Sequence, residues 1–208
     1  KISEIAAACL RWPGAGFRIR EDDRDGLLYM AWILIGTVPA AVVAFTLKDR
    51  IESLFDVPEA SSVFLVVTGF LLLITRGRSG DRPLTFRTVV LIGLAQAVAI
   101  LPGCSRSGWT IAVALLAGTG FERAAEFSFM LSIPAILGAL LLEAVGGALT
   151  LSAGSVFLLV LGTVMAFAAG VFALRLLIYL LKKGSFYRFS WYLIPAGLLS
   201  LGYFLTAG

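Results

Sequence analysis

The sequence contains no histidine and only two cysteines, Cys9 and Cys104, in 208 residues. Without histidine, no imidazole can activate a serine or cysteine nucleophile, so we interpret Cys104 as a small apolar filler rather than a reactive thiolate. Two cysteines provide no disulfide framework. Charged residues are also scarce, at 14%, against 59% hydrophobic residues. This composition excludes an ordinary soluble domain and indicates an integral membrane protein.

The net charge of +4 is modest and is better explained by membrane topology than by nucleic acid, for which no binding pattern appears. The uncharged runs predict an all-α, polytopic protein with a single membrane domain over residues 1–208. Residues 1–25 form a polar lead-in on the cytoplasmic side. The expected spans are 26–47, 60–75, 127–147, 156–181 and 189–207. Residues 88–120 are expected to form a re-entrant helix pair.

The re-entrant prediction depends on length and on helix-ending residues. As a helix, the run 88–104 reaches about 25 Å, which is short of a hydrocarbon core of roughly 30 Å. Pro102 and Gly103 would end this helix, and Ser105 or Ser107 can cap a second helix that begins around Gly108. The stretch therefore predicts a helix, a polar tip and a returning helix.

The distribution of basic residues supports this topology. The loop 76–87 carries four arginines against one acid, and a second basic loop follows at 182–188, so both are expected on the cytoplasmic side. The two loops share one side only if residues 88–120 return to the side that they left. Two full short crossings would satisfy this condition equally well.

Arg106 is the anomaly of the tip, because an arginine at membrane depth costs about 2.5–3.5 kcal/mol unless water or an anion compensates it. No acid lies between Arg87 and Glu122, so an anionic ligand is a serious candidate. The guanidinium can grip two phosphate oxygens, and the start of a helix favours negative charge. The neighbouring candidates are the hydroxyls of Ser105, Ser107 and Thr110 and the open backbone of Gly103 and Gly108.

Two alternatives remain beside this hypothesis. The tip could be a simple turn at the membrane surface, with Arg106 extending to water. Gln96, ten residues earlier within the first half-helix, could serve either as a packing contact between helices or as part of the site.

Residues 96–110, with the core Pro-Gly-Cys-Ser-Arg-Ser-Gly, resemble the second signature of the undecaprenyl-diphosphatase family, the bacitracin-resistance phosphatases of bacterial envelopes. Further similarity lies at 35–40, 49–55, 125–129 and 132–134. The resemblance implies a fold of two inverted repeats, each with a re-entrant helix pair. It also implies a multi-pass protein of the bacterial cytoplasmic membrane that hydrolyses undecaprenyl diphosphate to the monophosphate and so recycles the lipid carrier of peptidoglycan synthesis.

The resemblance assigns roles to the residues of the tip. Ser105, Arg106 and Thr110 are the candidate catalytic residues, and Gly103, Ser107, Gly108 and Gln96 are the candidate substrate-binding residues. A divalent cation, Mg or Ca, is expected as cofactor, but we expect none of its ligands in this chain. The expected partners are a polyprenyl diphosphate and membrane lipids, and a homodimer is left open.

The family's first signature, with paired acidic residues and a Ser-Ser-x-Gly-His run, is absent from this sequence. The chain is therefore either an incomplete piece, as its start at Lys1 suggests, or a shortened relative, and we favour the former. A transporter or flippase of a polyprenyl phosphate or another anion is the alternative function, because broken helices with a buried arginine serve transport equally well. A non-catalytic membrane scaffold is the third.

Overall fold

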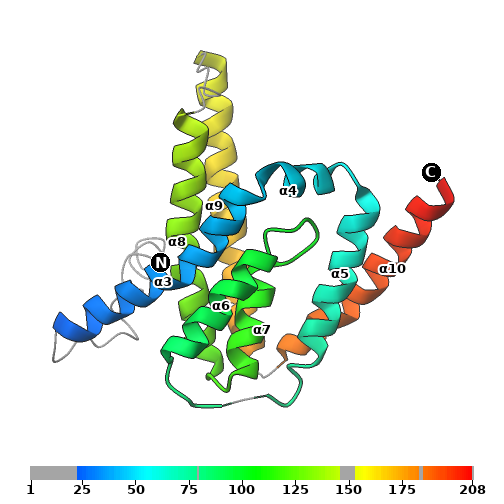
Figure 1. The fold of residues 1–208 in the computed structure, drawn as a ribbon. Helices are drawn as coiled ribbons and strands as arrows, with labels where there is room; N and C mark the ends of the chain where they lie inside the picture. The colour runs from blue at the N-terminus through cyan, green and yellow to red at the C-terminus, as the bar shows by residue number, and fades with distance from the viewer. Residues whose placement is uncertain (1–22, 79, 146–152, 183–184, 208) are drawn as a thin grey trace.

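The computed structural model describes residues 23–78, 80–145, 153–182 and 185–207, and Figure 1 shows that this part of the chain is built from helices. Its one isolated β-bridge joins Arg82 and Thr119. The all-α prediction is therefore confirmed. The helices are α3 (Asp23–Thr46), α4 (Lys48–Phe55), α5 (Pro58–Leu73), α6 (Phe86–Val98), α7 (Arg106–Leu116), α8 (Phe121–Val145), α9 (Ala153–Lys182), the short 3-10 helix η1 (Phe186–Phe189) and α10 (Ser190–Ala207).

Four segments in the described part of the chain are long and apolar enough to cross a membrane, so the protein is a multi-pass membrane protein. They are Leu28–Thr46, Phe121–Leu141, Phe157–Leu177 and Phe186–Thr206. The expected span at 60–75 corresponds to α5, which has 16 residues and is too short to count as a span by itself. Together with α4 it is long and apolar enough, but the two helices are bent by 97° relative to each other. Whether α5 crosses alone stays a prediction. The lead-in up to residue 22 lies outside the described residues.

α6 and α7 are the two helices of the stretch 88–120, and their re-entry into the membrane from one side stays a prediction. They have 13 and 11 residues, about 20 and 17 Å of helix, so neither spans a hydrocarbon core. In Figure 1 the basic loop 76–87 lies at the bottom, and the tip between α6 and α7 points up into the bundle. The first helix ends at Val98, earlier than the uncharged run suggests, and the second begins at Arg106 rather than at Gly108.

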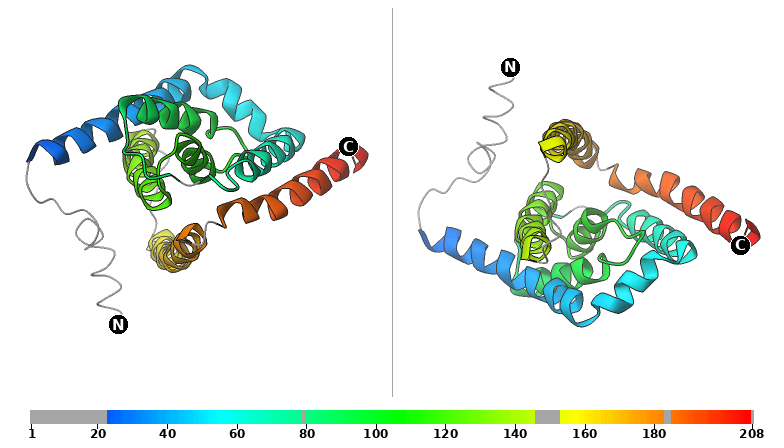
Figure 2. Two further views of the ribbon diagram at one scale, coloured as in Figure 1. Left: turned by 90° about the horizontal axis from the view of Figure 1, so that it is seen from below. Right: turned by 90° about the horizontal axis from the view of Figure 1, so that it is seen from above.

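Figure 2 shows α7 in the centre of the bundle, between α5, α6 and α8. The fully buried side chains gather on these helices and hold α7 from several sides, because each buried apolar side chain contributes about 1.5–3 kcal/mol. They include Val89, Ile92, Ile111, Leu115, Phe127 and Leu131. The start of α7 is therefore placed by a packed core and not by a free loop.

α3 crosses α6 with its backbone in close contact. A Cβ atom on Gly93 would lie 2.6 Å from the carbonyl oxygen of Gly36, so only glycine fits at this crossing. Small residues allow two membrane helices to approach in this way. The crossing brings the second half of α3 alongside the end of α6, where the tip begins.

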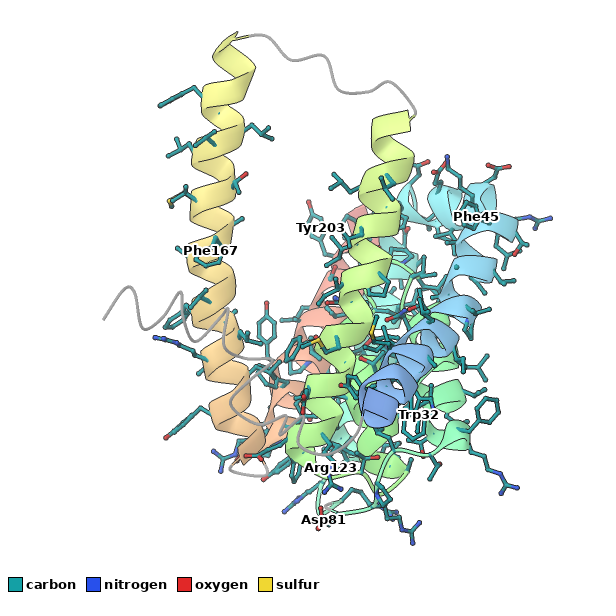
Figure 3. The ribbon with its side chains drawn as sticks, turned by 90° about the vertical axis from the view of Figure 1, so that its left-hand side faces the viewer. Trp32, Phe45, Asp81, Arg123, Phe167 and Tyr203 are labelled. Carbon is teal, nitrogen blue, oxygen red and sulfur yellow. The ribbon has the colours of Figure 1, made fainter. Side chains whose placement is uncertain are left out.

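The sides of the bundle are apolar, and charged residues gather at its two ends, on α4 at the upper end and around Asp81 at the lower end. In Figure 3, Phe45, Phe167 and Tyr203 extend outward along the helices, and all three are exposed. Asp81 and Arg123 lie together at the lower end, where they form a 3.3 Å ion pair. This distribution matches a protein whose sides contact lipid and whose basic loops contact water.

Candidate functional site

The tip between α6 and α7 rests on α5. Gly103 has a φ of +84°, and a Cβ at this position would lie 2.0 Å from the carbonyl oxygen of Ser61. Glycine is required here for two reasons, because the left-handed backbone is costly for other residues and because no atom fits in the gap. The open backbone of Gly103 is thus occupied by α5, and its contact with a substrate stays a prediction.

Ser105 begins α7 as its N-cap. Its Oγ accepts a hydrogen bond from the Gly108 N–H at 3.2 Å, and Gly108 has no room for a Cβ because Ser105 lies 2.9 Å away. The Trp109 indole N–H donates to Thr68 Oγ1 of α5 at 3.0 Å, which fixes the first turn. The N–H groups of Arg106 and Ser107, the first two of the helix, have no acceptor within α7, so they can bind an anion.

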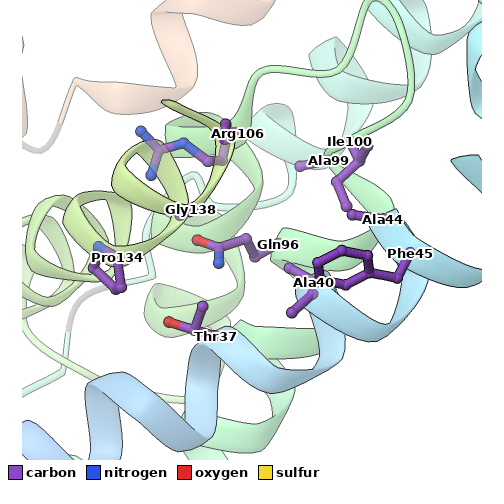
Figure 4. Close-up of a pocket in the computed structure, with 13 residues that line it drawn as sticks. Thr37, Ala40, Ala44, Phe45, Gln96, Ala99, Ile100, Arg106, Pro134 and Gly138 are labelled. Carbon is purple, nitrogen blue, oxygen red and sulfur yellow. The ribbon is translucent and has the colours of Figure 1, made fainter. Parts of the chain in front are cut away.

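Arg106 and Gln96 line the same cavity of about 350 Å³, which lies between α3, the end of α6, the start of α7 and α8. In Figure 4 the guanidinium of Arg106 and the amide of Gln96 both extend toward α8. The remaining lining is Thr37, Ala40, Ala41, Ala44, Phe45, Ala99, Ile100, Pro134, Ala135, Gly138 and Ala139. Its volume is in the range of small-ligand sites.

Two of the three polar side chains of this cavity, Arg106 and Gln96, carry buried atoms without a hydrogen-bond partner in the described part of the chain, whereas Thr37 donates to the Ile33 carbonyl at 2.8 Å. The unpartnered atoms are Nη1 of Arg106 and both Oε1 and Nε2 of Gln96, and the Gln96 side chain is only 2% exposed. An unsatisfied buried polar group costs about 1–3 kcal/mol, and a charged one costs more. None of the residues that line the cavity is acidic. The cavity is therefore prepared for an anionic ligand that also hydrogen-bonds an amide.

Ser105 and Ser107 face a different cavity. With Gly108 they line a space of about 250 Å³, whose other walls are Leu72, Ala173, Leu177, Phe186, Phe189 and Leu193. Consecutive residues of a helix point about 100° apart, so neighbours of Arg106 turn away from it. The structure thus brings Arg106 and Gln96 together and places the two serine hydroxyls on another side of α7.

Thr110 lines neither cavity. It is fully buried, and its hydroxyl lies 2.6 Å from Ser128 Oγ of α8 and donates to the Arg106 carbonyl at 2.9 Å. These contacts tie the first turn of α7 to α8. In this arrangement Thr110 positions Arg106, and direct contact with a reacting group stays a prediction.

Sequence reasoning missed several residues that line the cavity of Arg106 and Gln96. Thr37 and Pro134 belong to the segments 35–40 and 132–134, whose resemblance to the family was the available signal. Phe45 and Gly138 carried no such signal, because a phenylalanine and a glycine in apolar helices are ordinary there. Only the crossing of α3 and α8 beside the tip shows that they share a cavity.

The described residues do not provide a metal site. No group of three or more Asp, Glu or Cys side chains that could hold a metal ion occurs in this part of the chain, and the sequence has no histidine. The polar groups at the cavity are one guanidinium, one amide and one threonine hydroxyl, which are poor ligands for Mg²⁺ or Ca²⁺ compared with carboxylates. The residues present do not fit the expected cation.

Comparison with known proteins gives one family. The profile of the family described as bacitracin resistance protein BacA matches residues 2–199. Relatives named undecaprenyl-diphosphatase include those of Treponema denticola, 38% identical over 193 residues, and Korarchaeum cryptofilum, 39% identical over 173 residues. The matches cover 91% and 82% of this chain but 71% and 64% of the relatives. A relative from Methanothermobacter thermautotrophicus is 42% identical over 178 residues, which is 97% of its length.

Proposed function

The chain belongs to the bacitracin resistance protein BacA family, and we propose from this premise that it hydrolyses undecaprenyl diphosphate to undecaprenyl phosphate and inorganic phosphate. The family match and the relatives' shared name support this activity. The reaction returns the lipid carrier of peptidoglycan synthesis to use. A substrate with a charged head and a long apolar tail also suits a protein whose anion-binding cavity lies inside a membrane bundle.

One observation carries the proposal, namely that Nη1 of Arg106 and the whole amide of Gln96 are buried and unpartnered in one cavity of the described part of the chain. A diphosphate supplies acceptors for the Arg106 guanidinium and for the Gln96 N–H, and a water molecule beside it can donate to Gln96 Oε1. The diphosphate oxygens accept from the Arg106 guanidinium as a charge-assisted pair and from the Gln96 N–H. The N–H groups of Arg106 and Ser107, which have no acceptor within α7, are further donors at the start of the same helix.

The reaction breaks the bond between the terminal phosphorus and the bridging oxygen, and water supplies the new oxygen. Negative charge is spread over the transferred phosphoryl group, so fixed positive charge and N–H donors are the main protein contribution. Arg106 stabilises this charge, and Oε1 of Gln96 can accept a hydrogen bond from the attacking water. The water must also lose a proton, and no carboxylate is among the residues that line the cavity. The acidic residues that the resemblance implies for this step stay a prediction.

The cofactor, the membrane and the oligomeric state are proposed from the family resemblance. A divalent cation, Mg or Ca, is proposed as cofactor on the resemblance alone, and no step is derived through it because the described residues do not fit it. The membrane is proposed to be the bacterial cytoplasmic membrane. A homodimer stays an open prediction.

Phosphate release from undecaprenyl diphosphate by the purified full-length protein, in lipid nanodiscs and with or without a chelator, tests the proposal. We expect Arg106→Ala to lower the turnover number about 10²–10³-fold, as removal of a preorganised donor does. Arg123→Ala is the matched control, because Arg123 pairs with exposed Asp81 in the basic loop region, away from the cavity. Equal rates in Arg106→Ala and wild type would overturn the assignment, and an inactive wild type would leave transport as the leading function.

A further inference from the structure

The cavity that holds Arg106 and Gln96 is polar at one part of its wall and apolar over the rest. Six alanines and one glycine form most of the lining, with Phe45, Ile100 and Pro134. Small side chains leave space, and Arg106 is the single charged residue among the described residues that line it. The apolar part of this wall suits a flexible hydrocarbon, because it offers no hydrogen-bond partner to a polar ligand group.

The apolar part of the cavity reaches the exposed surface of the described helices. Phe45 lines the cavity and is also 67% exposed, so the cavity meets the outside at this side chain. Val42 of α3 and Leu137 of α8, which adjoin the lining residues Ala41 and Gly138 in sequence, are also exposed apolar residues. Phe45 lies three residues before Lys48, the first residue of the charged helix α4, so the cavity opens where apolar helix surface meets charged side chains.

Gly138 of α8 is a wall residue with open space around its Cα atom. A Cβ atom at Gly138 would meet nothing within 4 Å, in contrast to Gly93, where it would meet backbone. Close helix packing therefore does not explain this glycine. It lies four residues after Pro134, one turn along the same face of α8, and both line the cavity.

We propose that Gly138 determines the specificity of this protein for the apolar tail, because it sets the width of the cavity beside Arg106 that receives the isoprenoid segment next to the diphosphate. The inference rests on the proposed function for the identity of the head group. A larger side chain at 138 fills the cavity and displaces the tail, while the folded backbone remains as it is. Substrates with no more than a few carbons do not need that space.

The experiment is a size series, Gly138→Ala, Gly138→Leu and Gly138→Phe, with Gly162→Leu as the matched control. Gly162 is also a glycine within a long helix, α9, where a Cβ atom would likewise meet nothing within 4 Å, but it does not line the cavity. The specificity constant kcat/KM is measured for undecaprenyl diphosphate, farnesyl diphosphate and isopentenyl diphosphate. Thermal unfolding in nanodiscs checks that all variants are folded.

We expect Gly138→Leu and Gly138→Phe to lower kcat/KM for the two long substrates by tenfold or more, at the scale of about 10–200-fold for one methylene in an apolar pocket. The value for isopentenyl diphosphate stays within about twofold of wild type, a change that corresponds to less than 0.5 kcal/mol. Gly162→Leu matches wild type on all three substrates. An equal loss on all substrates, or no loss on any, overturns the proposal.

A second measurement does not depend on turnover. A farnesyl phosphate that carries a diazirine in its tail is crosslinked to the protein, and the labelled peptides are identified by mass spectrometry. We expect label on α3 and α8 that is lost in Gly138→Phe and retained in Gly162→Leu. Label that is unchanged in Gly138→Phe overturns the proposal. If the wild type releases no phosphate, the proposed function fails, and the labelling result still decides the role of Gly138.

Discussion

Replacing Gly103 by alanine tests whether the contact between the tip and α5 places Arg106. The left-handed backbone at Gly103 costs an alanine about 1–2 kcal/mol. The new Cβ would also lie 2.0 Å from the Ser61 carbonyl oxygen, whereas ordinary contact begins at 3.4 Å, so the tip must move by more than an ångström. Arg106 follows three residues later, and a misplacement of about 1 Å costs roughly 10²-fold in rate. We therefore expect about a hundredfold loss of phosphate release.

Gly77→Ala separates backbone strain from displacement. Gly77 has a similar φ of +71°, but a Cβ there would meet nothing within 4 Å. Gly77→Ala should lower the free energy of unfolding by about 1–2 kcal/mol and leave the rate of phosphate release unchanged. Thermal unfolding in nanodiscs and phosphate release are measured for both variants. If Gly103→Ala keeps wild-type turnover, or if the two variants lose activity equally, the tip is not held by Ser61 in the way described.

Two further predictions concern side chains that contact the tip. Gln96→Leu should lower turnover but leave the unfolding temperature equal or higher, because it removes a buried unpartnered amide; a clear loss of stability would instead assign Gln96 to helix packing. Trp109→Phe removes the 3.0 Å hydrogen bond to Thr68 and should lower the free energy of unfolding by about 0.5–1.5 kcal/mol. In a double-mutant cycle with Thr68→Val, a coupling energy near zero would contradict this hydrogen bond.

Much of the helical arrangement follows from the sequence alone. The lengths of the uncharged runs indicate which helices are long and apolar, and the short run before Pro102 indicates a half-helix. Ser105 as a helix cap follows from its residue type and from its place after a proline and a glycine. The absence of nearby acids around Arg106 points to an anionic ligand, and Nη1 of this arginine has no partner among the described residues.

The division of the site between two cavities does not follow from the sequence. Ser105, Arg106 and Ser107 are consecutive, and one motif suggests one ligand, but a helix directs neighbours to different sides. Thr110 has the spacing of a residue on the face of Arg106, yet its hydroxyl is directed to Ser128. These outcomes depend on which helix packs against which face of α7, and tertiary contacts alone determine that.

The crossing of α3 and α6 also limits how this protein can change over evolutionary time. Gly36 and Gly93 meet through their backbones. Any side chain added at this crossing would have to push the two helices apart. The cavity that holds Arg106 and Gln96 already has alanine or glycine at most of its lining positions. Apart from Phe45 and Ile100, almost any substitution of its apolar wall can only reduce the space. Single substitutions can therefore narrow the cavity at most positions of its wall, whereas they can widen it only at the few larger residues, such as Phe45 and Ile100.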